Sequence, residues 1–168
     1  MKNTNVKKMV AAAMFAAMVY VSTMVIQISI PSGYINFGDA FVLMAGFTLG
    51  PVYGGLAAAI GSSLADLIAF PAYAPATFVI KFLVALSAAF LSKKISSNKK
   101  YFISSFIGEL VMVAGYFVYE SIFIKLGFGA LASVPFNAIQ GTVAVVVSVV
   151  IMNILTRNKS LKQLFDFK

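Results

Sequence analysis

The sequence contains no cysteine, no histidine and no tryptophan, and only 11% of its 168 residues are charged. The lack of cysteine excludes disulfide frameworks, thiol nucleophiles and cysteine-based metal sites, and the lack of histidine excludes catalysis by an imidazole. Motifs such as G-x-S-x-G and H-E-x-x-H are also absent. We therefore expect no catalytic residues and no metal site.

Apolar residues dominate what is present. They make up 61% of the chain, with a mean hydropathy of +0.95, whereas soluble domains have about 45–50% apolar residues. The apolar runs fall at 6–28, 38–49, 52–70, 75–91, 101–126 and 134–156. A transmembrane helix needs about 20 such residues, so we predict an all-α integral membrane protein, with six transmembrane helices in a single domain over residues 1–168.

The first two of these runs differ in length. The first is a full span without a convincing cleavage pattern, so we expect it to stay in the protein rather than act as a removable signal peptide. The second is short, and Gly50 and Pro51 follow it directly. We therefore expect the second and third helices to meet at a tight turn or to be partly broken.

Basic residues predict the orientation. Three segments hold most of the 13 Lys and Arg residues: Lys2, Lys7 and Lys8; Lys93, Lys94, Lys99 and Lys100; and Arg157, Lys159, Lys162 and Lys168. Cytoplasmic segments retain such residues, and with six spans all three lie on one side, so both termini are predicted to be cytoplasmic. The net charge of +8 therefore does not indicate a nucleic-acid partner. The C-terminal KSLKQLFDFK fits a basic amphipathic end at the bilayer surface or a solvated tail.

Polar side chains inside a bilayer are costly and mark functional sites. With this orientation, seven of them lie in the outer half: Gln27, Asp39, Asp66, Lys81, Glu120, Asn137 and Gln140. Asn137 and Gln140 are three residues apart and share a helix face, where their amides suit the edge of a heteroaromatic ring. Hydrogen bonding between helices is the alternative.

The first two outer loops, SIPSGYINFG and FPAYAPAT, are short and rich in proline and glycine. Tyr34, Asn36 and Tyr73 lie in them, so the loops are candidates to cover an outward-facing cavity and contact a planar ligand. In the other interpretation the loops only make turns, and their tyrosines belong to the interfacial aromatic belt.

The charged residues also leave alternatives open. Lys81 and Glu120 fit an internal ion pair or the recognition of a charged ligand group. Asp39 suits the cap of a helix that begins at Gly38, and Asp66 suits a bond to a neighbouring helix. Glu109 lies nearer the cytoplasmic side, as a buried structural carboxyl or a coupling group.

Small residues recur at spacings of four, a pattern that allows helices to approach closely in lipid. Ala12 with Ala16, and Ala13 with Ala17, form such pairs on the first helix. These alanines lie away from the polar cluster. They are candidates to receive a helix of a partner protein, or else they pack within the monomer.

Several motifs carry a family resemblance: YINFGD at 34–39, LGP at 49–51 with GG at 54–55, ADL at 65–67, YAPAT at 73–77 with Lys81, and NAIQG at 137–141. In this order they resemble the substrate-binding S component of energy-coupling factor (ECF) vitamin transporters, over essentially the whole chain. The likeness is closest around the riboflavin, pyridoxine and hydroxymethylpyrimidine group.

The resemblance implies a subunit of an ABC-type importer in the bacterial plasma membrane. Such a subunit captures a vitamin from outside and docks on a transmembrane coupling subunit attached to two cytoplasmic ATPases. It needs no cofactor of its own, in keeping with the absence of a phosphate-binding loop motif. The resemblance also implies docking through the alanines of the first helix, and a ligand site formed by the outer loops and helices four to six.

The expected substrate-binding residues are Tyr34, Asn36, Asp39, Asp66, Tyr73, Lys81, Glu120, Asn137 and Gln140. Two rival hypotheses stand beside this one. The first is a self-sufficient secondary transporter or channel driven by a proton gradient, although no inverted repeat is evident. The second is an intramembrane enzyme built on two of the membrane carboxylates.

Overall fold

The computed structural model describes residues 2–30 and 33–157, which form six α-helices, a β-hairpin and a 3-10 helix. The elements are α1 (Lys2–Val25), β1 (Gln27–Ile30), β2 (Gly33–Asn36), α2 (Gly38–Leu49), α3 (Pro51–Ala69), α4 (Ala74–Lys94), α5 (Lys100–Ile122), η1 (Gly127–Ala132) and α6 (Val134–Arg157). Each predicted apolar run therefore corresponds to one helix. The basic end at 159–168 lies outside the described residues.

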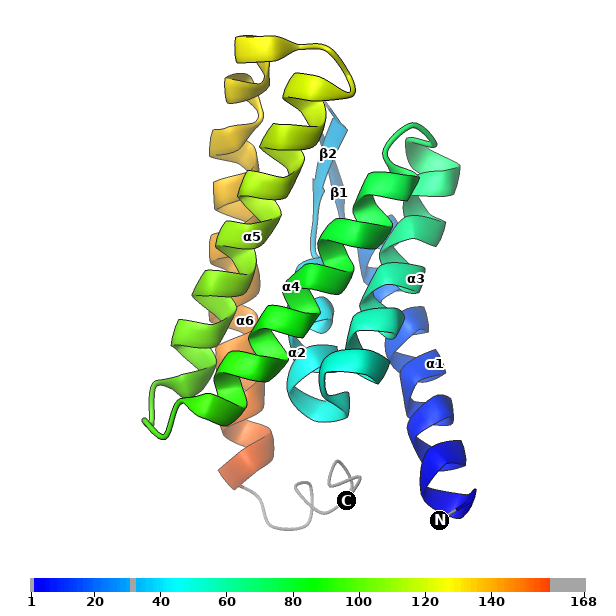
Figure 1. Ribbon diagram of the computed structural model, residues 1–168, viewed down its shortest axis with the longest axis vertical. Coiled ribbons are helices and arrows are strands. Elements are labelled where there is room, and N and C mark those ends of the chain that lie inside the picture. Colours follow the sequence, from blue (N-terminus) through cyan, green and yellow to red (C-terminus); the bar gives the residue numbers. More distant parts are fainter. Residues whose placement is uncertain (1, 31–32, 158–168) are drawn as a thin grey trace.

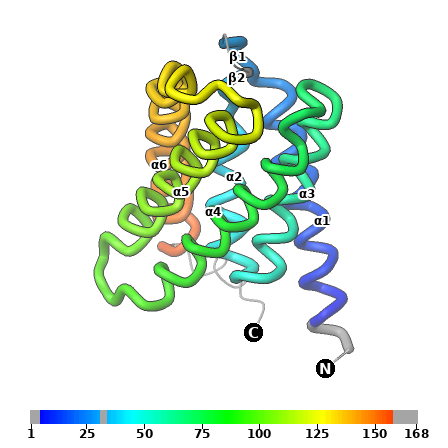
Figure 2. Tube along the Cα trace, turned by 45° about the horizontal axis from the view of Figure 1, so that its top comes forward, coloured from blue at the N-terminus to red at the C-terminus, as the bar shows by residue number. Residues whose placement is uncertain are grey.

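The helices form a bundle in which α1 begins and α6 ends at the same end of the molecule (Figure 1). α3 packs between α1 and α4, and α4, α5 and α6 pack against one another in chain order. α2 lies in the middle, in contact with α1, α3, α4 and α6 (Figure 2). The fully buried side chains of Val19, Leu43, Val84 and Met112 join four of these helices in one core.

Large apolar side chains also cover the outside of the bundle, as expected for a surface that faces lipid. Phe90 is 59% exposed and Ile122 is 63% exposed. Five helical segments, those containing α1, α3, α4, α5 and α6, are long and apolar enough to cross a bilayer. The chain is therefore an integral membrane protein that crosses the bilayer several times.

α2 is shorter than the other helices. Its 12 residues span about 18 Å at 1.5 Å per residue, well below the roughly 30 Å of a bilayer core. In Figure 1, β2 extends from the start of α2 toward the end of the molecule opposite the start of α1. The predicted tight turn after α2 is present: Gly50 has a φ of +81° and Pro51 begins α3. Glycine adopts this left-handed conformation without steric cost, and proline suits the first helical position.

The β-hairpin is a feature that the apolar pattern did not predict. α1 ends at Val25, three residues before the expected end, so Gln27 lies on β1 and not on the first helix. The strands pair antiparallel, with Gln27 opposite Asn36 and Ile30 opposite Gly33. The cause is local: isoleucines at 26, 28 and 30 alternate with Gln27 and Ser29, a period of two with β-branched residues that favours a strand.

The end of the fifth helix also differs from the prediction. α5 stops at Ile122 instead of reaching 126, and the chain then forms η1. Lys125, between the two, and Gly127, the first residue of η1, take positive φ values of 64° and 54°. These residues break the helical path because left-handed backbone cannot continue a right-handed helix.

Candidate functional site

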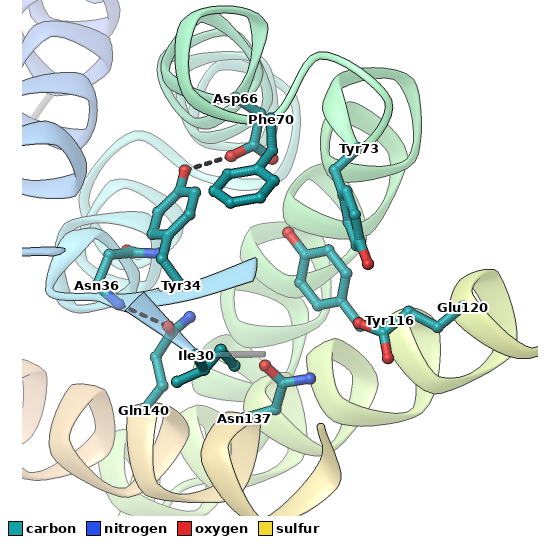
Figure 3. A pocket seen from close by; sticks show the side chains of 10 residues that line it. All are labelled: Ile30, Tyr34, Asn36, Asp66, Phe70, Tyr73, Tyr116, Glu120, Asn137 and Gln140. Atoms are coloured by element: carbon teal, nitrogen blue, oxygen red, sulfur yellow. Dashed lines mark hydrogen bonds between the residues drawn. The ribbon is translucent and has the colours of Figure 1, made fainter. Parts of the chain in front are cut away.

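A small cavity lies at the end of the bundle opposite the start of α1. It has a volume of about 50 Å³, is open on one side, and lies between the hairpin, the last turns of α3 and α5, the α3–α4 loop and the first turns of α6 (Figure 3). Its lining residues are Ile30, Tyr34, Asn36, Asp66, Phe70, Tyr73, Tyr116, Glu120, Asn137 and Gln140. Seven of the nine predicted binding residues are among them, and the exceptions are Asp39 and Lys81.

Asp66 connects the hairpin to the helices. The hydroxyl of Tyr34 donates to Asp66 Oδ1, and the hydroxyl of Thr77 donates to Asp66 Oδ2. The Thr77 Oγ1 atom also lies 2.9 Å from the Tyr116 hydroxyl, which extends the network to α5. Burial and the negative charge of Asp66 both raise the pKa of Tyr34, so its phenol stays a neutral donor. The expected bond from Asp66 to a neighbouring helix is thus present.

Asp39 and Lys81 form a buried ion pair next to the cavity. Lys81 Nζ lies 2.5 Å from Asp39 Oδ1, and both side chains are almost fully buried. Lys81 also lies over the Tyr116 ring, 5.2 Å from its centroid. The alternative in which Lys81 pairs with Glu120 is therefore wrong. The N-cap residue of α2 is Phe37 and not Asp39, and the two carboxylate oxygens of Asp39 are directed to Lys81 and to Gln140 of α6.

Gln140 is the link between this ion pair and the hairpin. Its Nε2 donates to Asp39 Oδ2 at 2.6 Å, and its Oε1 accepts a hydrogen bond from the backbone N–H of Asn36 at 2.7 Å. The second of these bonds is visible in Figure 3. Both ends of this amide are used within the protein. Of the predicted Asn137–Gln140 pair, Gln140 therefore makes the interhelical hydrogen bond that was the alternative, to Asp39 of α2, and a second bond to the hairpin.

Asn137 differs from Gln140. It is 8% exposed, and its Nδ2 is buried and has no hydrogen-bond partner among the residues that the structure describes. An unpaired buried donor costs about 1–3 kcal/mol. Asn137 shares the cavity wall with Glu120, which accepts a hydrogen bond from the Ser133 hydroxyl. This wall thus presents an unsatisfied amide donor beside a carboxylate.

Aromatic rings form the opposite wall (Figure 3). Ring centroids are 5.5 Å apart for Tyr34 and Phe70, 6.4 Å for Phe70 and Tyr73, and 6.5 Å for Tyr73 and Tyr116. Burial and the negative charge of Glu120 raise the pKa of Tyr73 to about 12. The wall therefore offers flat apolar faces edged with neutral hydroxyls, which suits a planar ring.

Three of the lining residues were not among the predicted binding residues: Ile30, Phe70 and Tyr116. Phe70 belongs to the loop FPAYAPAT, and Tyr116 lies one turn before Glu120. That spacing of four was the available signal, because residues i and i+4 share a helix face. Ile30 had no such signal, since its place depends on the hairpin.

Glu109, for which a structural or a coupling role was expected, does not line the cavity. It lines an apolar groove between α5 and α6. It is 4% exposed, and neither carboxylate oxygen has a hydrogen-bond partner within residues 2–30 and 33–157. Over the same residues, no group of three or more acidic side chains could hold a metal ion.

The four alanines of the first helix line a separate groove between α1 and α3. It has a volume of about 890 Å³ and an almost wholly apolar wall, with Ala12, Ala13, Ala16 and Ala17 on the α1 side. Ala13 and Ala17 are exposed, whereas the Ala16 carbonyl is so close to Gly61 that a Cβ there would come within 2.4 Å of it. The four alanines therefore contribute to packing within the monomer and also leave an open apolar surface.

Comparison with known proteins decides the family. The model of the family described as "ECF-type riboflavin transporter, S component" matches residues 3–157. The chain belongs to this S component family. A protein of Pyrococcus woesei described as "Uncharacterized protein in gap 3'region" is 38% identical over 100 residues, which are 58% of this chain and 68% of that protein.

A solved structure shares the fold of this S component. It is described as "Structure and mechanism of the S component of a bacterial ECF transporter", and the match has a TM-score of 0.68 at 24% sequence identity. The match covers 91% of this chain and 97% of the solved one. The match of the family model over residues 3–157 confirms the predicted family. It is a family of transporter subunits and not of enzymes, which argues against the hypothesis of an intramembrane enzyme.

Proposed function

We propose that this S component captures a vitamin or vitamin precursor of the pyridoxine, hydroxymethylpyrimidine or riboflavin type from outside the cell and delivers it through an ATPase-driven coupling complex. The observation that carries the proposal is the cavity wall at Asn137. Its buried Nδ2 has no hydrogen-bond partner among residues 2–30 and 33–157, so a ligand with a ring nitrogen or carbonyl oxygen would satisfy it. A donor on the same ligand edge would meet Glu120, and the rings of Phe70 and Tyr73 would cover its faces.

The size of the cavity ranks the candidate ligands. A volume of about 50 Å³ holds only a few water molecules, because each needs roughly 10–15 Å³ by this measure. Even a small vitamin must therefore extend through the open side of the cavity or displace part of the lining. The hairpin is the part that we expect to move. Among the described residues, it is held across the cavity by the hydrogen bonds of Tyr34 with Asp66 and of Asn36 with Gln140. A single-ring ligand requires the smallest displacement, which favours pyridoxine or hydroxymethylpyrimidine over riboflavin.

The transport partners follow from the same proposal. The apolar groove between α1 and α3 would receive a helix of the transmembrane coupling subunit, to which two cytoplasmic ATPases attach. The basic residues at the start of α1, in the α4–α5 loop and at the end of α6 favour a cytoplasmic location for that end of the bundle. The cavity then opens toward the outside of a bacterial plasma membrane.

Mass spectrometry of small molecules released from the mildly purified protein tests the proposal. We expect one vitamin per chain. Titration with pyridoxine, hydroxymethylpyrimidine and riboflavin separately would then give the affinities. Asn137→Ala should weaken binding of the recovered vitamin about tenfold or more, since a buried hydrogen bond contributes about 1–3 kcal/mol when its partner is left unpaired.

Asn153→Ala is the matched control, because Asn153 lies on the same helix at the other end of the bundle. Equal affinity of the Asn137 and Asn153 variants would show that the cavity is not the binding site. A protein that retains no vitamin and moves protons into liposomes without partners would favour the secondary transporter instead.

A further inference from the structure

A second polar site lies at the opposite end of the bundle. It is a cleft of about 550 Å³ between the α4–α5 loop and the last turn of α6. Its polar lining residues are Ser96, Ser97, Asn98, Lys100, Asn153, Thr156 and Arg157. All of them carry side-chain hydrogen-bond donors, and none of the described residues in the lining is acidic. The cleft is therefore suited to an anion with several acceptor oxygens.

The loop side of the cleft is ordered by its own hydrogen bonds. The backbone N–H of Lys99 donates to Ser97 Oγ at 3.2 Å, and the N–H of Lys100 donates to the Ser97 carbonyl at 3.0 Å. Lys100 Nζ lies 4.9 Å from the centroid of the Tyr101 ring, which also lines the cleft. Lys100 is thus held at the cleft from one side, and Arg157 in the last turn of α6 lies on the other.

An apolar groove runs along the same two helices toward the middle of the bundle. It has a volume of about 470 Å³, and its α5 wall begins at Phe102, directly after Tyr101. Phe102 and Phe106 are each about half exposed and stack with a centroid distance of 6.4 Å. Val146 forms part of the α6 wall, two helical turns before Asn153 of the cleft. The basic cleft and the apolar groove are thus formed by successive stretches of the same two helices.

We propose that one anionic phospholipid binds here, with its phosphate on Lys100 and Arg157 and an acyl chain in the groove between α5 and α6. A basic pocket at a membrane surface recognises anionic headgroups, and each such side chain adds about 1 kcal/mol of attraction. A soluble phosphate would leave the groove unused. The segment that follows Arg157 is a poor occupant by charge, because it brings Lys159, Lys162 and Lys168 against a single Asp166.

Native mass spectrometry in detergent tests the lipid site, with added phosphatidylglycerol or phosphatidylcholine as the probe. We expect the protein to retain one phosphatidylglycerol and to bind phosphatidylcholine at least tenfold more weakly. The double variant Lys100→Gln/Arg157→Gln should lose most of this preference. Lys7→Gln/Lys8→Gln is the matched control, because it removes the same charge from the same end of the bundle but on α1, and it should behave as the unmodified protein.

The groove is tested without a change of charge. Val146→Trp fills it and should reduce phosphatidylglycerol retention several-fold, whereas Val143→Trp, on the same helix but outside the groove lining, should not. Thermal unfolding midpoints of all variants report whether they remain folded. Because none of these measurements uses a vitamin, their outcome is independent of the proposed function.

Three results would overturn the lipid site. Equal loss in the Lys7→Gln/Lys8→Gln control would show general attraction to a basic surface. Equal retention of phosphatidylcholine would show that the headgroup charge is not recognised. Binding that occurs only after removal of residues 158–168 would show that the chain's own C-terminal segment fills the cleft.

Discussion

Lys81 of α4 and Asp39 of α2 form an ion pair that is buried in the bundle, with 2.5 Å between Nζ and Oδ1. The second oxygen of Asp39 accepts a hydrogen bond from Nε2 of Gln140. The Oε1 atom of Gln140 in turn accepts a hydrogen bond from the backbone N–H of Asn36. One carboxylate thus joins α2, α4 and α6 and holds the base of the hairpin through a single intermediate side chain.

Breaking this pair should destabilise the fold strongly. Lys81→Met leaves Asp39 as an uncompensated buried charge. In comparable cases this lowers the free energy of unfolding by about 3–5 kcal/mol. We expect a clearly lower thermal unfolding midpoint in detergent. Lys125→Met is the control, because Lys125 is exposed beyond α5, and its effect should be small. Similar midpoints for the two variants would contradict the role assigned to the ion pair.

Tyr34→Phe should loosen the hairpin while leaving the bundle intact. The substitution keeps the ring against Phe70 and removes the hydroxyl that donates to Asp66. A hydrogen bond to a charged group contributes about 1.5–3 kcal/mol, so the amides of residues 27–36 should exchange with deuterium faster. Tyr53→Phe, in the groove between α1 and α3, should leave their exchange unchanged. Slow exchange in both variants would mean that other contacts hold the hairpin.

Glu109→Gln should not reduce stability. Neither carboxylate oxygen of Glu109 has a hydrogen-bond partner in the described part of the chain, and an amide is easier to bury than a carboxylate. We expect an unfolding midpoint equal to or above that of the unmodified protein. Glu120→Gln, which weakens the bond accepted from Ser133, should lower it. A large loss in the Glu109 variant would reveal a bound donor or cation at that position.

Ala13→Trp should block docking without unfolding the protein. Ala13 is exposed in the groove between α1 and α3, so a bulky side chain there has room but occupies the surface offered to a partner. We expect vitamin binding to persist while co-purification with the coupling subunit is lost. Met14→Trp, which is exposed on α1 outside the groove lining, should retain the complex. Ala16 is less suitable, because it packs on Gly61.

The helices of this S component could be predicted from the sequence because burial in lipid requires long apolar runs. The hairpin could not be, since its strands are only four residues each and lie between stronger helical signals. The position of the polar residues along the helices was also predictable, and the structure places Tyr73, Glu120 and Asn137 in one cavity. Their partners were not predictable: that Lys81 would pair with Asp39 depends on how α2 sits between α4 and α6.

The junction of α1 with the hairpin has a mechanical consequence. Only Ile26 separates the last residue of α1 from the first residue of β1, so little slack exists between the helix that lines the alanine groove and the strand that leads to the cavity. A tilt of α1 imposed by a docked helix would pull on β1, and through Tyr34 and Asn36 on the cavity wall. Docking of a partner helix and release of the ligand would then be coupled through the short connection between α1 and β1.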